Sequence, residues 1–314
     1  MWRSAIVLII LALVVGIVGA IALGAYRWHL GTKELRANLE AARLPIKPLT
    51  FDAREIADLP QPVQRYFRAV LKDGQPLIVA ARVSHEGRFN MSETAEKWSA
   101  FASTQLVITQ RPGFDWDGRI AMIPGINAFV HDAYITGEGI LHAALLGLVT
   151  LADLRGTPEA ALGELMRFFA EAAWYPTRLL PSQGVRWEAI DNSSARATLQ
   201  DGDTAVSLDF RFDEAGLIAT VRAEARARTV NGGLVFAPWI GRFWDYVWRE
   251  GMRIPRSGEV AWQLPDGSLL PYWRGRITHI AYHGNNLIIR VHIAILAVVN
   301  FLPHPNPPLT KGRE

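Results

Sequence analysis

The sequence contains no cysteine among its 314 residues, which excludes disulfide bonds, thiolate metal sites and a cysteine nucleophile. Several catalytic signatures are missing as well. There is no nucleophile elbow G-x-S-x-G, no phosphate-binding G-x-x-x-x-G-K and no zinc-binding H-E-x-x-H. The histidines show no metal-ligand spacing, so the sequence predicts no metal site and no cofactor. A non-catalytic protein is therefore expected rather than an enzyme.

The formal net charge of +3 does not arise from the central part of the chain. Residues 48–283 hold 24 basic and 27 acidic residues, because the excess of Lys and Arg lies near the two ends. A nucleic-acid-binding domain needs a basic footprint of its own. The sequence therefore argues against a nucleic-acid partner, and the basic residues near the N-terminus point to the membrane surface instead.

A long uncharged run lies near the N-terminus. Residues 4–26 carry no charge, and Ala5–Ala25 are all apolar or glycine. At about 1.5 Å of rise per residue, a helix of this length spans the roughly 30 Å hydrocarbon core of a bilayer. A cleaved signal peptide is the alternative, although its apolar region usually covers only about 7–15 residues. We expect residues 1–26 to form a retained single-pass transmembrane helix in the cell membrane.

The remaining chain divides into three parts by composition. Residues 27–59 predict a juxtamembrane helix and a proline-containing linker, and residues 60–283 predict a β-rich globular domain. Residues 284–314 end in a proline-dense stretch and predict a disordered extension outside the fold. Basic residues after the apolar run favour a cytoplasmic domain, but long domains translocate largely regardless of charge. Both sides of the membrane stay open, with the extracytoplasmic side as our expectation.

The hydrophobic pattern after residue 77 has mostly the period of two that is typical of β-strands. Asp-Gly at Asp201-Gly202 is a strong hairpin signal, and Thr157-Pro158-Glu159 predicts a helix start. The fold class is therefore α+β, mainly antiparallel β: a curved sheet or half-barrel wrapping one or two helices, preceded by one transmembrane helix. Strands are expected near 83–91, 98–109, 114–123, 133–141, 185–191, 194–200, 203–212, 217–228, 241–250, 252–263 and 271–282, with a further helix at 60–72.

Two acidic pairs could serve a hydrolase that works with paired carboxylates. Asp115 and Asp117 share a strand face, and Asp132 and Glu138 do so if their strand is regular. Solvated residues on an exposed sheet face are the more common explanation of such pairs. The spacing of acidic and basic residues over 164–171 similarly predicts an exposed ladder of charges on a helix.

Tryptophan is abundant, with 11 residues in total and eight of them between residues 98 and 262. Such rings most often fill a hydrophobic core. The functional alternative is an aromatic-lined cavity that binds an apolar ligand or an acyl chain. Alternation places Trp244, Tyr246 and Trp248 on one strand face. The residues expected to line a cavity are Trp116, Tyr134, Trp174, Trp187, Trp244, Tyr246 and Trp262.

Several short motifs rich in aromatic, acidic and glycine residues lie between residues 60 and 283. They are Arg65-Tyr66-Phe67, Gly113-Phe114-Asp115-Trp116-Asp117, Asp132-Ala133-Tyr134, Gly137-Glu138-Gly139, Ala170-Glu171-Ala172-Ala173-Trp174-Tyr175-Pro176, Leu179-Leu180-Pro181, Val185-Arg186-Trp187, Arg253-Ile254-Pro255 and Gly258-Glu259-Val260-Ala261-Trp262. This set resembles a bacterial family of uncharacterised membrane-anchored proteins with a domain of unknown function. That resemblance implies no catalytic residues.

The order of strands and helices is more loosely similar to lipoprotein carriers of the LolA/LolB type. In those proteins a curved antiparallel sheet wraps helices around an apolar cavity, so the resemblance implies a lipid or lipoprotein partner. The present chain departs from soluble carriers by its expected anchor and its lack of a lipid-attachment cysteine. Three hypotheses follow: a membrane-anchored domain that binds a hydrophobic ligand, which we favour, a paired-carboxylate hydrolase, and a non-catalytic scaffold module of the envelope.

Overall fold

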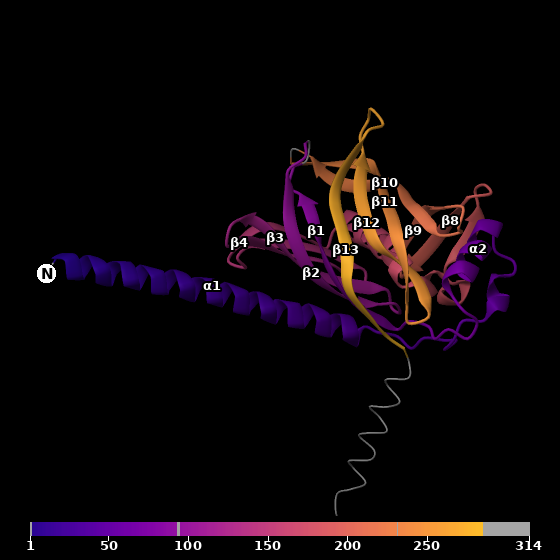
Figure 1. Ribbon diagram of the computed structural model, residues 1–314, viewed down its shortest axis with the longest axis horizontal. Coiled ribbons are helices and arrows are strands. Elements are labelled where there is room, and N and C mark those ends of the chain that lie inside the picture. The colour runs from indigo at the N-terminus through magenta and orange to yellow at the C-terminus, as the bar shows by residue number, and fades with distance from the viewer. Residues whose placement is uncertain (1, 93–94, 231, 285–314) are drawn as a thin grey trace, which may run out of the picture.

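A long helix leads into one antiparallel sheet in the computed structural model, which describes residues 2–92, 95–230 and 232–284 (Figure 1). Helix α1 runs from Trp2 to Ala41, and α2 from Gln61 to Val70 after a short 3-10 helix, η1, at Ala53–Ile56. One helix of the described chain, α1, is long and apolar enough to cross a membrane. Apart from Gly284, the predicted extension over 284–314 lies outside the described residues.

Within the described residues, thirteen strands form the sheet. They are β1 (Ala80–Asn90), β2 (Trp98–Ile108), β3 (Gly113–Ile123), β4 (Ile126–Ile135), β5 (Glu138–Leu145), β6 (Val149–Arg155), β7 (Arg186–Ala189), β8 (Ser194–Asp201), β9 (Thr204–Phe212), β10 (Ile218–Val230), β11 (Gly233–Arg249), β12 (Met252–Gln263) and β13 (Leu269–His283). Their order is β6-β5-β4-β3-β2-β1-β13-β12-β11-β10-β9-β8-β7, so β6 and β7 are the two edges. The curved, open, mainly antiparallel sheet confirms the predicted fold class.

Helix α3 (Pro158–Ala170) follows edge strand β6 and packs across the concave face against β5, β9, β10 and β4. Its start confirms the predicted capping signal: the Thr157 hydroxyl accepts a hydrogen bond from the Ala160 amide at 3.2 Å, and Pro158 takes the first helical position. Close packing also requires a glycine on β5, because a Cβ at Gly139 would overlap the backbone of Ala160. The helix thus rests directly on the sheet at this point.

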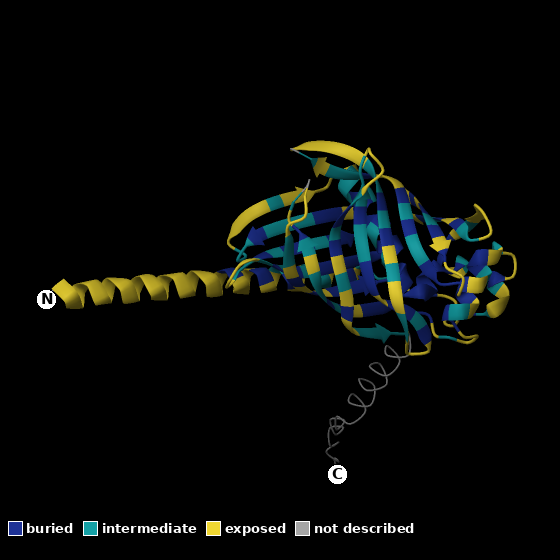
Figure 2. Cartoon of the chain, turned by 45° about the horizontal axis from the view of Figure 1, so that its top comes forward, coloured by how far each residue is buried: buried dark blue, intermediate teal, exposed yellow. Residues whose placement is uncertain are grey.

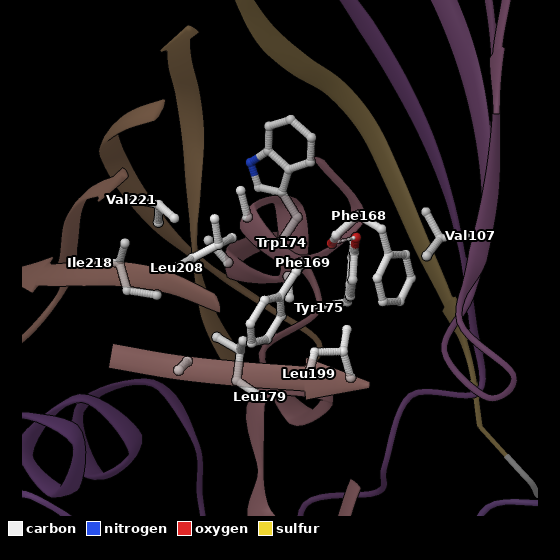
Figure 3. Packing of buried hydrophobic residues seen from close by; sticks show 14 of the residues in the cluster. Val107, Phe168, Phe169, Trp174, Tyr175, Leu179, Leu199, Leu208, Ile218 and Val221 are labelled. Atoms are coloured by element: carbon white, nitrogen blue, oxygen red, sulfur yellow. Dashed lines mark hydrogen bonds between the residues drawn. The ribbon is translucent and has the colours of Figure 1, made fainter. Parts of the chain in front are cut away.

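After α3, three short 3-10 helices, η2 (Glu171–Trp174), η3 (Pro176–Leu179) and η4 (Pro181–Gln183), return the chain to β7. Phe168, Phe169 and Tyr175 are fully buried, and they pack with Leu199 of β8 and Leu208 of β9 (Figure 3). The Tyr175 hydroxyl donates to the Phe168 carbonyl at 2.6 Å, so its burial leaves no donor unsatisfied. This core fixes α3 and the segment that follows it inside the curve of the sheet.

The C-terminal part of α1 packs on the opposite, convex face of the sheet. Exposed residues cover most of the helix up to Leu23, and burial begins at Gly24 (Figure 2). Leu39 joins a small apolar cluster with residues of β2 and β4, such as Leu106 and Ala133. The predicted juxtamembrane helix is therefore continuous with the apolar segment and lies against the domain.

Two strand predictions were wrong for identifiable reasons. The segment 133–141 is a hairpin between β4 and β5, because Thr136 and Gly137 adopt positive φ values of 52° and 91°. Strand β11 begins at Gly233, although the sequence pattern predicted its start at residue 241. Its alternation breaks at Asp245, where φ is 58°, so Trp244 is 43% exposed whereas Tyr246 packs against the core.

Candidate ligand-binding cavity

A cavity of about 700 Å³ lies between the concave face of the sheet and α3. Its volume falls in the range of about 300–1,000 Å³ that is usual for small-molecule sites. The side of α3 that faces it carries Gly163, Glu164 and Arg167. Its aromatic lining comes from several strands that are distant in sequence and from the segment after α3: Phe89, Trp116, Trp174, Trp239, Phe243, Trp262, Tyr272 and Trp273.

Three of the seven residues predicted to line a cavity are found there: Trp116 of β3, Trp174 after α3 and Trp262 of β12. The Trp174 ring lies 6.3 Å from that of Trp273, and the Trp262 ring stacks on Tyr272 at 5.6 Å. The structure therefore brings these rings to one concave surface. A ligand role for them stays a prediction.

The other four predicted residues lie elsewhere. The Tyr134 hydroxyl donates to Asp201 at 2.9 Å, and the Trp187 indole donates to the Leu179 carbonyl at 2.9 Å. The Tyr246 hydroxyl donates to the Ile218 carbonyl at 2.7 Å. Trp244 is exposed. Hydrogen-bonded anchoring within the core explains three of these positions, since buried hydroxyl and indole groups need partners.

Trp239, Tyr272 and Trp273 line the cavity but were not singled out from the sequence. The Trp239 indole donates to the Tyr272 hydroxyl at 2.8 Å, and the same hydroxyl receives Arg226 Nη1 at 3.2 Å. Trp239 lies in the part of β11 that the sequence pattern missed. Its pairing with Trp262 across β11 and β12 is the signal that could have identified it.

The predicted exposed ladder of charges on α3 is wrong, because these side chains face the cavity and the sheet. Arg167 forms an ion pair with Asp132 of β4, and its Nε lies 2.8 Å from Glu171 Oε1. Gln105 Nε2 donates to the other Glu171 oxygen at 2.7 Å. The Arg167 guanidinium also lies over the Trp116 ring, 5.4 Å from its centroid. Periodicity alone could not show that a curved sheet would cover this face of the helix.

The carboxyl groups of buried Glu164 and half-buried Asp132 are neighbours at the cavity floor. Arg226 Nη2 donates to Glu164 Oε1 at 3.0 Å. Burial, and then the nearby charge of Asp132, raises the pKa of Glu164 well above its ordinary value of 4.5. The remaining oxygens, Asp132 Oδ1 and Glu164 Oε2, are shielded from solvent and have no other donor among the described residues. The raised pKa favours the neutral, protonated form of Glu164 at pH 7.

His85 lies behind this cluster, with its ring 4.9 Å from that of Trp174. Burial, helped by the positive charge of Arg167, lowers the pKa of His85 to about 3, so the ring is neutral at pH 7. Within the described part of the chain, no group of three His, Asp or Glu side chains could hold a metal ion. The polar floor of the cavity can donate and accept hydrogen bonds.

Neither acidic pair of the hydrolase hypothesis forms a site in the cavity. Asp115 and Asp117 point away from it toward α1, where Arg36 and Trp28 bind them at 2.8 and 2.9 Å. Asp132 lines the cavity, but Glu138 is exposed at the turn between β4 and β5. The carboxyl partner of Asp132 is Glu164, which the sequence pattern had assigned to an exposed helix face.

Residues 57–282 match the profile of a family described as a family of unknown function (DUF6920). This match covers more than half of the chain and nearly the whole span over which the motifs resembled an uncharacterised family. No curated protein matches the sequence.

Two solved structures are similar in fold at low identity. One is a LolA superfamily protein from Nitrosomonas europaea, with 12% identity and a TM-score of 0.31, covering 72% of this chain and 94% of that protein. The other is a β-barrel-like protein of the domain of unknown function DUF1849 from Brucella abortus. It has 13% identity and a TM-score of 0.18, and the match covers 66% of this chain and 99% of that protein. Similarities this low carry no argument about function.

Proposed function

This chain belongs to the DUF6920 family of unknown function, and from that premise we propose that it is a single-pass membrane-anchored domain that binds a hydrophobic ligand, a lipid or an acyl group, beneath α3. Residues 1–26 act as the anchor, 27–59 as the juxtamembrane helix and linker, and 60–283 as the binding domain. The proposal rests on one observation, the cavity of about 700 Å³ with its mainly apolar and aromatic lining. Trp116, Trp174 and Trp262 are the predicted ligand contacts that this cavity retains.

The mouth of the cavity supports an apolar ligand. Four of its lining residues are apolar and exposed: Met91, Leu151, Leu154 and Leu234. An apolar rim lets an acyl chain stay out of water while it enters. Within the described part of the cavity floor, Arg167 pairs with Asp132 and Glu171, and Arg226 pairs with Glu164. The floor thus offers hydrogen bonds without an excess of positive charge.

Photocrosslinking tests this function. The full chain is reconstituted in nanodiscs that contain a phosphatidylcholine with a diazirine on one acyl chain, and the crosslinked peptides are mapped by mass spectrometry. We expect crosslinks on cavity strands such as β11 and β12, in addition to those on α1. Substituting Ala143→Trp, at a half-buried lining position of β5, should lower the cavity crosslinks severalfold by filling the space.

The matched control is Ala102→Trp, at an exposed position of β2 on the face turned away from the cavity. It should leave the crosslinks unchanged. Crosslinks confined to α1, in the native chain as well as in both variants, would overturn the proposed function.

A second candidate, hydrolysis of an ester lipid, is favoured by the carboxyl pair of Asp132 and Glu164. A neutral carboxyl group beside a carboxylate is the arrangement that general acid–base catalysis uses. Turnover of p-nitrophenyl acyl esters by the full chain, abolished in Glu164→Gln, would support it. Turnover that Glu164→Gln leaves unchanged would refute it.

A further inference from the structure

The turn between β5 and β6 rests directly on α1. Gly24 is the first buried position of the helix, and a Cβ there would overlap the Leu146 carbonyl oxygen and lie 2.6 Å from Leu148 Cγ. In the same contact, a Cβ at Gly147 would lie 2.7 Å from the Gly24 carbonyl oxygen. Backbone therefore meets backbone here, and the hairpin tip has a fixed position along the helix axis.

That position lies within the apolar run of the helix. The run covers Ala5–Ala25, and a hydrocarbon core of roughly 30 Å needs about 20 helical residues. Gly24 is therefore inside or at the edge of the hydrocarbon region when α1 crosses a bilayer. Any segment packed beside Gly24 must lie at the same depth.

The surface at this end of the sheet suits that depth. The β3–β4 turn and the β5–β6 turn lie side by side, since the Leu146 amide donates to the Asn127 carbonyl at 3.0 Å. Residues 120–130 and 143–152 contain no charged side chain. The tip that they form, called the apolar tip below, exposes Met122, Ile123, Leu148 and Val149 at 41, 60, 42 and 60%.

Polar groups return one helical turn after Gly24. The Trp28 ring stacks on that of His142, with the centroids 5.4 Å apart. The Arg119 guanidinium lies 5.7 Å from the centroid of the Trp28 ring. Tryptophan and arginine are typical of the membrane–water interface. Four residues of helix correspond to about 6 Å, which matches the 5–10 Å that interfacial segments reach into a bilayer.

We propose that the apolar tip inserts into the same bilayer that α1 crosses, with Trp28, Arg119 and His142 at the interface. The apolar tip contacts lipid hydrocarbon, because it is fixed at the depth of Gly24 along α1. The proposal does not depend on a ligand in the cavity.

Site-directed spin labelling tests it cleanly, because the chain has no native cysteine. Single variants Leu148→Cys and Val149→Cys of the full chain carry a nitroxide in phosphatidylcholine nanodiscs. Collisions with oxygen, which concentrates in hydrocarbon, are compared with collisions with a water-soluble nickel chelate. Val14→Cys marks the middle of the apolar run, and Ile190→Cys is the control at an exposed position beside β7, the opposite edge strand of the sheet.

We expect the ratio of oxygen to nickel collisions at residues 148 and 149 to exceed the ratio at residue 190 severalfold and to approach that at residue 14. Nickel collisions at 148 and 149 as frequent as at 190, while residue 14 reports hydrocarbon, would overturn the proposal. Low collision rates with both reagents would also overturn it, because they would indicate a protein partner on the tip.

Discussion

Strands β3 and β4 bury carboxylates on both of their faces, but the two faces satisfy them differently. On the convex face, each oxygen of Asp115 and Asp117 has a side-chain partner, and α1 provides several of these partners. On the concave face, Asp132 Oδ1 and Glu164 Oε2 are shielded from solvent and have no hydrogen-bond partner among the described residues. The convex cluster is thus closed by the chain itself, whereas the concave cluster borders a cavity.

The convex cluster contains a row of groups that superficially resembles a nucleophilic triad. Thr32 Oγ1 lies 3.2 Å from His131 Nε2, and His131 Nδ1 lies 2.7 Å from Asp115 Oδ1. The hydroxyl is buried and also contacts Asp117 Oδ2 and the Trp28 carbonyl, both at 3.1 Å. The row therefore holds α1 on the sheet. The comparison teaches that buried polar groups indicate a site only where the chain leaves space beside them.

The largest expected effect comes from breaking the concave cluster at Arg167. Arg167→Met leaves Asp132 and Glu171 without their cation, and removing one partner of a buried ion pair typically costs about 3–5 kcal/mol. Urea unfolding of the full chain in detergent, followed by tryptophan fluorescence, measures this loss. The matched control is Arg196→Met, whose partner Asp209 lies on an exposed part of the sheet. An unfolding midpoint of Arg167→Met equal to that of the control would contradict the assigned role.

A smaller effect is expected from the convex cluster. Asp115→Asn removes the charge that binds Arg36 and His131, and a buried hydrogen-bonded group left without its partner costs about 1–3 kcal/mol. Because these bonds hold α1 to the sheet, trypsin should cut faster at Arg36 in the variant. The exposed substitution Asp153→Asn should leave the cleavage rate unchanged. Faster cleavage at other sites but not at Arg36 would indicate general unfolding and would contradict the prediction.

The raised pKa of Glu164 predicts that the stability of the fold depends on pH. Since the folded-state pKa of Glu164 is raised above 4.5, the folded chain binds more protons than the unfolded chain above that pH. Glu164 therefore contributes its full stabilisation of the fold below pH 4.5, and this contribution is lost as the pH rises through the raised pKa. Unfolding free energies at pH 5, 7 and 9 should show this decline in the native chain and a shallower one in Glu164→Gln. Parallel profiles would contradict the raised pKa of Glu164.

The smallest effect is expected where an ion pair lies in solvent. Glu86 and Arg276 pair across β1 and β13 with both side chains about half exposed. Glu86→Gln should change the unfolding free energy by less than about 1 kcal/mol, because exposed pairs contribute little. A loss as large as that of Arg167→Met would remove the contrast between paired charges in solvent and paired charges beside the cavity.

Local patterns predicted most of the fold. The Thr157 cap, the Asp-Gly turn and the alternation in β8, β9 and β12 all act over short distances, so the sequence shows them directly. The pairing of β1 with β13 joins residues far apart in sequence, and no local signal specifies it. It is also the pairing that joins the two halves of the sheet around α3.

The cavity was harder to predict, because its residues depend on which face the sheet covers. An acid, an arginine and an acid at helical spacing look the same whether the helix face is solvated or buried under strands. Trp239, Tyr272 and Trp273 meet only through strand pairing. The positive φ at Asp245 likewise turned Trp244 outward, and alternation could not indicate it.

The attachment of α1 to the sheet determines how far this molecule can reach. Because the helix runs along the domain from Gly24 to Leu39 without a hinge, the domain follows every tilt of α1. In a membrane that α1 crosses, the opening under α3 therefore keeps a fixed position along the axis of that helix. Under the proposed function, such an attachment predicts a protein that searches in two dimensions and exchanges molecules with its own leaflet rather than one that ferries cargo between membranes.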